Sequence, residues 1–299
     1  MKILMTGGNG YIGQELTKIL RNNGYSVVSF DKTHLNRDSF EFKGDLIRET
    51  DISECFKENA GIKNVIHLAA IAGVERDASE YKAYLDNNVV GTSNLLKAMN
   101  ENKAEKILLA SSCSVYGSGR SHKEESELRP ESFYGLSKVL SEEVVKYYGS
   151  AFGISYNILR IFNVIGHGFN SDSQSKRLVP KILHNIRNGT EINSYLQKNS
   201  HEAQVRDYVD IKNVVKVFHD LISNPRPNEV FNIGSGKGTS VIEIAEICAK
   251  LIKKEYKIKP ANPRLGDCDT SVANTEKLKK FDLLEKSSIE NIIQEILKQ

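Results

Sequence analysis

The chain opens with the stretch MKILMTGGNGYIGQELTKIL, in which Gly7, Gly10 and Gly13 stand three residues apart between a short apolar run and a helix-like segment. Each glycine has a use in such a turn: one permits the tight turn, one lets the backbone approach a pyrophosphate, and one packs the helix on the strand. The free N–H groups and the positive dipole end at the start of the helix favour phosphate. The turn therefore predicts a strand, a dinucleotide-binding loop and a helix.

A second apolar run ends at Asp31. A carboxylate at that place can accept hydrogen bonds from both ribose hydroxyls of NAD, and it would repel the 2′-phosphate of NADP. Arg37 is a nearby cation that would argue for NADP, but it fits a solvated loop residue better. We therefore predict that the cofactor is NAD.

Short β-branched apolar runs alternate with helix-period stretches through the first half of the chain. The runs are typical of buried parallel strands, and the alternation predicts an α/β fold, a doubly wound parallel sheet of the Rossmann type. The predicted strands cover residues 2–6, 25–30, 64–70, 106–112 and 156–164, and the clearest helices cover 11–23 and 87–102.

The pattern changes after about Asn163, where a polar, Gly-rich segment leads into a helix-rich remainder. We expect residues 1–163 to form the NAD-binding Rossmann domain. Residues 164–299 are expected to form mainly a smaller, interleaved substrate-binding domain, with about 205–235 returning to the Rossmann sheet. No clean boundary is visible, so the ligand is expected in the cleft between the two.

The charge balance is nearly even, with 41 Lys and Arg against 38 Asp and Glu, a net charge of +3. Neither nucleic acid nor a membrane surface is therefore expected as a partner. No apolar run is long enough for a membrane span, and no leader segment is recognised. The cysteines have no metal-binding spacing, so no metal is expected, and they indicate free thiols in the cytoplasm. They are Cys55, Cys113, Cys248 and Cys268.

Tyr134 and Lys138 stand four residues apart in SFYGLSKVLSEEVVKYY, on one face of a predicted helix. A free tyrosine has a pKa near 10, but a nearby ammonium and a positive nicotinamide ring would favour the phenolate. Tyr134 could then remove a proton from a sugar or alcohol hydroxyl while hydride leaves the carbon. Ser112 ends the preceding predicted strand, and its hydroxyl could bind the same oxygen.

The chain resembles, nearly end to end, the NAD-dependent sugar-nucleotide epimerase/dehydratase group of the extended short-chain dehydrogenase/reductases. TGGNGYIG resembles the T-G-x-x-G-x-[IV]-G turn of this family, and VIHLAA its H-x-A-[AG] strand end. LRIFNVIG, VRDYVDIKNVV and RLGDCDTSVANTEKLKK resemble later family motifs. His67 of VIHLAA is interpreted as a packed strand-end residue rather than a ligand.

The resemblance implies a set of site residues. Those implied for the cofactor are Gly7, Gly10, Tyr11, Ile12, Gly13, Asp31, Asp45, Leu46, Ala69, Ala70, Asn88, Tyr134, Lys138 and Phe162. Those implied for the substrate are Ser112, Tyr134, Asn163, Arg206 and Arg264, with Ser112, Tyr134 and Lys138 as the catalytic set. The two arginines would clamp the diphosphate of a sugar nucleotide, a task that suits the guanidinium fork.

The residues after Ser112 narrow the reaction. Dehydratases of this group have an acidic pair there, in T-D-E-V-Y-G, whereas this chain has Cys113 and Ser114. Dehydration and decarboxylation are therefore disfavoured. The remaining set suffices to oxidise C4 and return the hydride to the other face, so the chain is expected to be a 4-epimerase of the UDP-hexose type. Val164, where the family usually has proline, is a small departure. Ala72 stands where UDP-galactose-type epimerases often carry lysine, and YLQKNS replaces their usual Y-G-x-G turn near Tyr195, so the sugar and the base stay open.

Two other functions stay open. The stretch SSC faintly resembles reductases, or epimerase-reductases, of 4-keto-6-deoxy sugar nucleotides, although these generally prefer NADP and Asp31 argues against it. A non-catalytic NAD-sensing regulator on the same fold is disfavoured because Ser112, Tyr134 and Lys138 are all present. A homodimer that packs two helices per subunit is implied by the resemblance.

Overall fold

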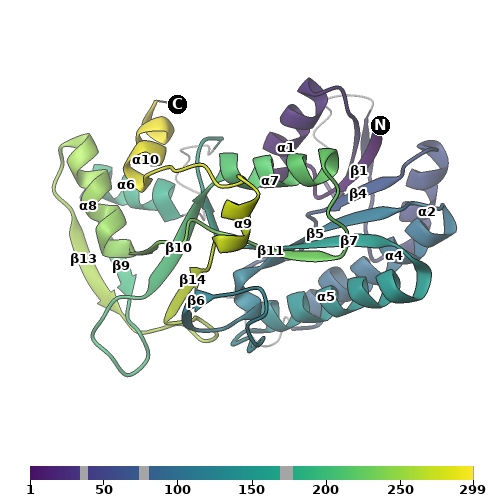
Figure 1. Ribbon diagram of the computed structural model, residues 1–299. Helices are drawn as coiled ribbons and strands as arrows, with labels where there is room; N and C mark the ends of the chain where they lie inside the picture. The colour runs from purple at the N-terminus through teal and green to yellow at the C-terminus, as the bar shows by residue number, and fades with distance from the viewer. Residues whose placement is uncertain (34–39, 74–80, 169–177, 299) are drawn as a thin grey trace.

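The computed structural model describes residues 1–33, 40–73, 81–168 and 178–298, and its larger part is a parallel sheet of seven strands (Figure 1). All neighbours in this sheet run parallel. Arg37 lies outside the described residues. Across the sheet the strands are β11 (Glu229–Ile233), β7 (Ser155–Ile161), β5 (Lys106–Ser112), β4 (Asn64–His67), β1 (Lys2–Thr6), β2 (Ser26–Asp31) and β3 (Glu41–Lys43).

The strand order reverses direction between β1 and β4, where the chain, having built β2 and β3 on one side of β1, continues on the other side. In a doubly wound sheet such a switch point leaves a crevice at the carboxyl ends of the strands, where ligands bind. The fold is therefore the predicted α/β type, and it opens its crevice beside the glycine turn.

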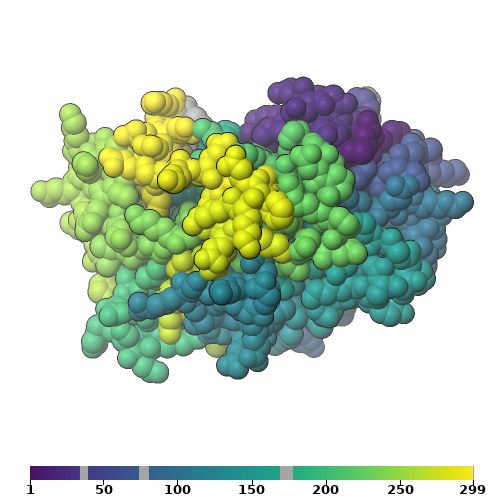
Figure 2. All heavy atoms as spheres, viewed as in Figure 1, coloured from purple at the N-terminus to yellow at the C-terminus, as the bar shows by residue number. Residues whose placement is uncertain are grey.

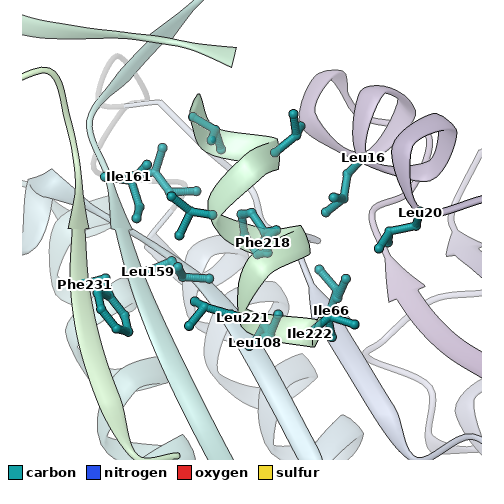
Figure 3. Close-up of a cluster of buried hydrophobic side chains, with 14 of the residues drawn as sticks. Leu16, Leu20, Ile66, Leu108, Leu159, Ile161, Phe218, Leu221, Ile222 and Phe231 are labelled. Atoms are coloured by element: carbon teal, nitrogen blue, oxygen red, sulfur yellow. The ribbon is translucent and has the colours of Figure 1, made fainter. Parts of the chain in front are cut away.

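Helices cover both faces of this sheet, as the apolar runs require. One face carries α1 (Tyr11–Asn22) and α7 (Ile211–Ser223). In Figure 3, Phe218 and Leu221 of α7 lie over Leu159 of the sheet, within a fully buried apolar cluster. The opposite face packs a second apolar cluster, which α2, α4 and α5 share with the sheet. Its helices are α2 (Glu49–Glu58), α4 (Gly91–Glu101) and α5 (Phe133–Phe152).

The smaller unit has its own sheets and core. Strand β10 (Val205–Asp210) pairs with β12 (Gly238–Ser240) and β14 (Thr270–Ala273), and β14 pairs with β6 (Gly119–His122). A two-stranded sheet joins β9 (Glu191–Tyr195) to β13 (Lys257–Ala261). Around them lie α6 (Leu178–Asn188), α8 (Val241–Ile252) and α10 (Ile289–Leu297), whereas α9 (Glu276–Lys280) packs against β11 of the large sheet.

The two units exchange segments more than the sequence predicts. β6 comes from the first half of the chain but lies in the second sheet, and β10 also belongs there, so of residues 205–235 it is α7 and β11 that return to the large sheet. In the space-filling view, C-terminal residues in yellow cover the middle of the visible face (Figure 2). The division at Asn163 stays a prediction.

Two predicted elements are interrupted. The expected strand 156–164 is divided after Ile161. Phe162 still donates its N–H to the Ile233 carbonyl of β11 at 3.0 Å, and the chain then leaves the large sheet to form β8 (Asn163–Ile165), which pairs with β10. The expected helix 87–102 begins as a π-helix, η2 (Leu85–Val90), which follows the short α3 (Tyr81–Tyr84). Among the described residues, none of the helices is both long and apolar enough to span a bilayer.

A buried ion pair connects the large sheet to α5. Arg160 of β7 contacts Glu142 of α5 at 2.7 Å, and both side chains are almost completely buried. Ser111 of β5 donates to the same carboxylate at 2.5 Å, and Arg160 donates to the Tyr116 hydroxyl at 2.8 Å. That hydroxyl donates in turn to Asn232 of β11 at 2.7 Å. The network therefore fixes α5 relative to three adjacent strands.

Arg160→Leu should lower the free energy of unfolding by about 3–5 kcal/mol, because it leaves the Glu142 carboxylate buried without its cation. Urea denaturation followed by circular dichroism measures the loss. The double variant Arg160→Leu with Glu142→Leu should lose less, since it removes both charges. Equal losses in the single and double variants would contradict this account.

Candidate active site

In the glycine turn between β1 and α1, the backbone at Gly7 lies close to the backbone of the loop after β4. Gly7 has a φ of +71°, and a Cβ on it would stand 2.7 Å from the Ala69 nitrogen, at the end of β4. A Cβ on Gly13 would stand 2.6 Å from the Gly7 carbonyl oxygen. Gly10 is the N-cap of α1 and has no side chain to occupy the helix N-terminus. The turn thus keeps open the space that a pyrophosphate would need.

Asp31 ends β2 and is held rigidly. One carboxylate oxygen accepts the Thr33 N–H and hydroxyl, both at 3.0 Å, and the other accepts the Asn9 N–H at 3.2 Å. Asp31 lines a cavity of about 260 Å³ together with Gly7 and Gly10. The same cavity is lined by Leu46, Ala69 and Ala70, which the sequence also predicts for the cofactor.

Lys32 is a residue of this cavity that the sequence reasoning missed. Its ammonium lies 3.3 Å from the Asp45 carboxylate and donates to the Asn87 side-chain oxygen at 2.5 Å. It therefore bridges the loop after β3 and helix η2 across the cavity that Asp31 lines. Its place directly after Asp31 is the signal in the sequence that could have identified it, whereas Arg37, the cation considered there, lies outside the described residues.

A larger cavity, of about 800 Å³, joins the glycine turn to the smaller unit. Its lining includes Gly13 of the turn, Ala110 of β5, Asn163 of β8, and both Arg206 and Arg264. Residues that the sequence predicts separately for the cofactor and for the substrate thus face one continuous space. Tyr11 and Ile12 line it as well.

The two arginines are held through one carboxylate. Arg264 donates to the Asp267 oxygens at 2.7 and 3.2 Å, and its guanidinium lies 4.4 Å from the centroid of the Tyr195 ring. Arg206 lies 4.0 Å from the same carboxylate and donates to the Gln204 side chain at 2.9 Å. Asp267 is almost completely buried. The two cations are therefore fixed beside each other at the cavity wall.

Ser112 lies close to Tyr134 and affects the pKa of its phenol. Burial raises the pKa of Tyr134 to about 12, against a smaller lowering by the nearby Ser112 hydroxyl. Ser112 also accepts the Ser114 N–H at 3.2 Å, at the start of the 3₁₀ turn η3 (Cys113–Val115). Ser112 thus meets Tyr134 at the carboxyl end of β5.

Lys138 is buried on the same helix, and burial lowers its pKa to about 8 against the opposing charge of Glu142. The sequence predicts that the Lys138 ammonium, together with the positive nicotinamide ring of the cofactor, favours the Tyr134 phenolate. In this structure burial dominates both groups, so the pKa of the phenol lies above its ordinary value. A depressed phenol pKa therefore requires positive charge beyond that of Lys138.

Some predicted residues do not line either cavity. Phe162 is buried in an apolar cluster with Val115, Tyr116 and Ala273, rather than exposed to the cleft. The Asn88 side-chain amide makes two hydrogen bonds to the backbone of Ile71. Its oxygen accepts the Ile71 N–H at 2.8 Å, and its nitrogen donates to the Ile71 carbonyl at 3.0 Å. The other predicted residues that line neither cavity are Asp45, Ser112, Tyr134 and Lys138.

Comparison with known proteins gives consistent matches. The model of the NAD dependent epimerase/dehydratase family matches residues 3–234. The UDP-glucose 4-epimerase of Streptococcus mutans is 29% identical, over 96% of this chain and 94% of the relative. A putative UDP-glucose 4-epimerase of Methanocaldococcus jannaschii is 36% identical, over 82% of this chain and 80% of the relative.

A solved structure agrees with the overall fold. The Thermus thermophilus UDP-glucose 4-epimerase in complex with NAD superposes with a TM-score of 0.89 at 27% identity. The match covers 100% of this chain and 98% of that one.

Proposed function

The chain belongs to the NAD dependent epimerase/dehydratase family, and from that premise we propose that it is an NAD-dependent 4-epimerase of a UDP-hexose. The observation that carries the proposal is the single cavity that reaches from the glycine turn to both arginines. Ala110 of β5 lines it, and the same strand ends at Ser112, whose hydroxyl lies close enough to Tyr134 to lower the pKa of the phenol. A cofactor at the glycine turn and a diphosphate sugar at the arginines would then meet near the end of β5.

The residues at the turn fit a dinucleotide. Gly7 lets the turn pack directly against the Ala69 backbone, and the uncapped N-terminus of α1 offers N–H groups and a positive dipole end to phosphate. Asp31 would hold the ribose hydroxyls, since its carboxylate is already fixed by Asn9 and Thr33. NAD bound there would accept a hydride from C4 of the sugar and return it.

Tyr134 would exchange the proton of the C4 hydroxyl. The phenol, with a pKa of about 12, holds its proton at neutral pH in the chain alone. It can accept the substrate proton only as the phenolate, which the positive nicotinamide ring of bound NAD, together with the Lys138 ammonium, would favour. Ser112 would bind the same substrate oxygen, and the phenol would later return the proton to that oxygen.

Cys113 and Ser114 explain why the keto sugar would not lose water. Burial raises the pKa of the Cys113 thiol, which therefore stays protonated at neutral pH. Neither side chain supplies the carboxylate pair that would remove and donate protons at C5 and C6. The keto sugar could instead turn about its diphosphate, which Arg206 and Arg264 would anchor, and present its other face.

An exposed apolar face indicates where a second copy would pack. The large apolar side chains on α3, η2 and α5 that stay exposed are Tyr81, Val90, Phe133, Leu136, Leu140, Tyr147 and Phe152. These elements contact one another and present one continuous helical surface. We propose that two copies associate through this face, because exposed patches of this kind are typical of protein–protein interfaces.

Cofactor choice depends on Asp31. Asp31→Asn keeps the hydrogen-bond acceptor but removes the charge that would face a 2′-phosphate, so the ratio of NAD to NADP affinity should fall. Lys32 would then be the nearest charge and would favour the phosphate. Calorimetric titration with both cofactors measures the ratio, and an unchanged ratio would show that the carboxylate does not set the preference.

Tyr134→Phe should leave NAD binding intact and reduce kcat by at least 10²–10⁴-fold, because the proton-exchanging oxygen is gone. Lys138→Met should keep less activity at pH 7 than at higher pH. With UDP-hexose deuterated at C4, mass spectrometry should find the label in the epimer and no accumulated NADH. A stoichiometric demand for NADPH would instead support a keto-sugar reductase, and inert wild-type protein that binds NAD would support a regulator.

Arg264→Lys and Arg206→Ala should weaken UDP-sugar binding while sparing NAD, each by roughly 1.5–3 kcal/mol, since each removes a charge-assisted hydrogen-bonding fork. Arg129→Ala is the matched control, because that guanidinium is exposed and pairs only with exposed Glu127 among described residues. Calorimetry with UDP measures the effect. Normal UDP binding by both variants would show that the diphosphate does not bind to the part of the cavity that Arg206 and Arg264 line.

Leu136→Glu together with Leu140→Glu should convert a dimer into a monomer, because two buried charges would face the partner copy. Leu265→Glu is the control, since Leu265 is 88% exposed and lies outside this face. Sedimentation velocity reports the mass. A monomeric wild-type protein, or a dimer that survives both charges, would rule out this interface.

A further inference from the structure

A chain of hydrogen bonds runs through the interior from the end of β1 to the catalytic helix. The Thr6 hydroxyl and His67 Nδ1 lie 2.6 Å apart, and His67 Nε2 lies 2.9 Å from the Thr92 hydroxyl. Thr92 lies 2.5 Å from the Asn88 carbonyl oxygen. All four side chains are at most 2% exposed. None of these contacts involves the groups to which the sequence assigns the reaction.

The direction of this chain follows from counting protons. The Asn88 carbonyl can only accept, so the single Thr92 hydroxyl proton is donated to it. Thr92 must then accept from His67, which places the imidazole proton on Nε2. Burial keeps the imidazole neutral, so Nδ1 is bare and accepts the Thr6 hydroxyl proton, while Thr6 accepts the Ala69 N–H at 3.4 Å. Each donor has one acceptor, and the imidazole is neutral.

Asn88 links this chain of hydrogen bonds to the residues of the candidate active site. Its side chain donates to the Ser137 hydroxyl at 2.9 Å and binds the Ile71 backbone, which lines the cavity of Asp31. Ser137 donates to the Tyr134 carbonyl at 2.8 Å, and Ser141 donates to the Asn88 carbonyl at 2.7 Å. One π-helical residue therefore holds both the loop after β4 and the first turns of α5.

We propose that His67, locked as the neutral Nε2–H tautomer between Thr6 and Thr92, is a positioning residue that fixes the cofactor-lining loop after β4 against the helix that carries Tyr134 and Lys138. Thr6 directly precedes the glycine turn, and His67 directly precedes Leu68–Ile71. Both loops of the cofactor cavity therefore start from residues that this chain of hydrogen bonds connects to Asn88. The link to catalysis rests on the proposed function, whereas the tautomer does not.

The electrostatics agree with this arrangement. Burial, aided by the nearby charge of Lys138, lowers the pKa of His67 to about 3. A second imidazole proton would sit on Nδ1 and face the Thr6 hydroxyl, which would have to reverse its own hydrogen bond. The neutral imidazole also adds no positive charge beside Lys138, whose own pKa burial lowers.

The first test measures the tautomer without any cofactor. In protein with ¹⁵N-labelled histidine, two-bond ¹H–¹⁵N correlation spectra distinguish protonated from bare ring nitrogens, and His67→Gln identifies the signals. We expect a bare Nδ1 and a protonated Nε2 that do not change between pH 7 and pH 5. A protonated Nδ1, or a titration in that range, would overturn the proposal.

The second test separates positioning from a role in packing alone. Thr92→Val keeps the volume but breaks the chain of hydrogen bonds, and Thr92→Ser keeps the hydroxyl. Thr92→Val should weaken NAD binding roughly 3- to 30-fold, and Thr92→Ser should restore it. The amides of Tyr134–Lys138 should exchange hydrogen faster in Thr92→Val than in Thr92→Ser, which needs no cofactor to observe.

A matched control is another buried histidine. His122 of β6 stacks on Tyr116 at 4.5 Å in the second sheet and has no part in this chain of hydrogen bonds. His122→Gln should leave NAD affinity and the exchange of α5 unchanged. Equal exchange in Thr92→Val and Thr92→Ser would overturn the proposal, whereas wild-type protein that shows the tautomer and the exchange difference but binds no NAD would count against the proposed function alone.

Discussion

The close contact of two backbones at the switch point of the large sheet determines the rest of the site. Gly7 and Ala69 approach so closely that no Cβ fits on the glycine, because β1 and β4 are neighbours and both end there. Because these backbones are in contact, the loop after β1 and the loop after β4 both line the same cavity. Every other part of the site is placed relative to this contact: α1 begins after it, Asp31 borders it, and β5 lies one strand further along.

The features that sequence alone predicted are those in which neighbouring residues define the geometry. The glycine turn, Asp31 at a strand end, and Tyr134 and Lys138 on one helix face each lie within a few residues of the elements that orient them. The parallel sheet follows from the same local alternation. The family resemblance added Arg206 and Arg264, whose spacing carries no signal until folding brings them to one carboxylate, Asp267.

The features that escaped prediction depend on contacts between distant segments. β6 enters the second sheet only because β14, about 150 residues later in the chain, offers it an edge. Lys32 matters only because Asp45 and Asn87 fold across from it. The burial that raises the pKa of Tyr134 in the chain alone also gave no signal in the sequence, since it reflects how much of the protein surrounds the phenol, which one helix cannot reveal.

Strand β10 has a mechanical consequence. Its first half, Val205–Asp207, is hydrogen-bonded to β12 and β14, its second half, Tyr208–Asp210, to β8, and α7 then continues directly onto the large sheet. β10 therefore stays within the smaller unit, and the step from Asp210 to Ile211 joins it to the large sheet without an intervening loop. This direct connection limits how freely the two units can turn against each other, so adjustment to ligand size falls mainly to side chains and loops at the mouth of the cleft.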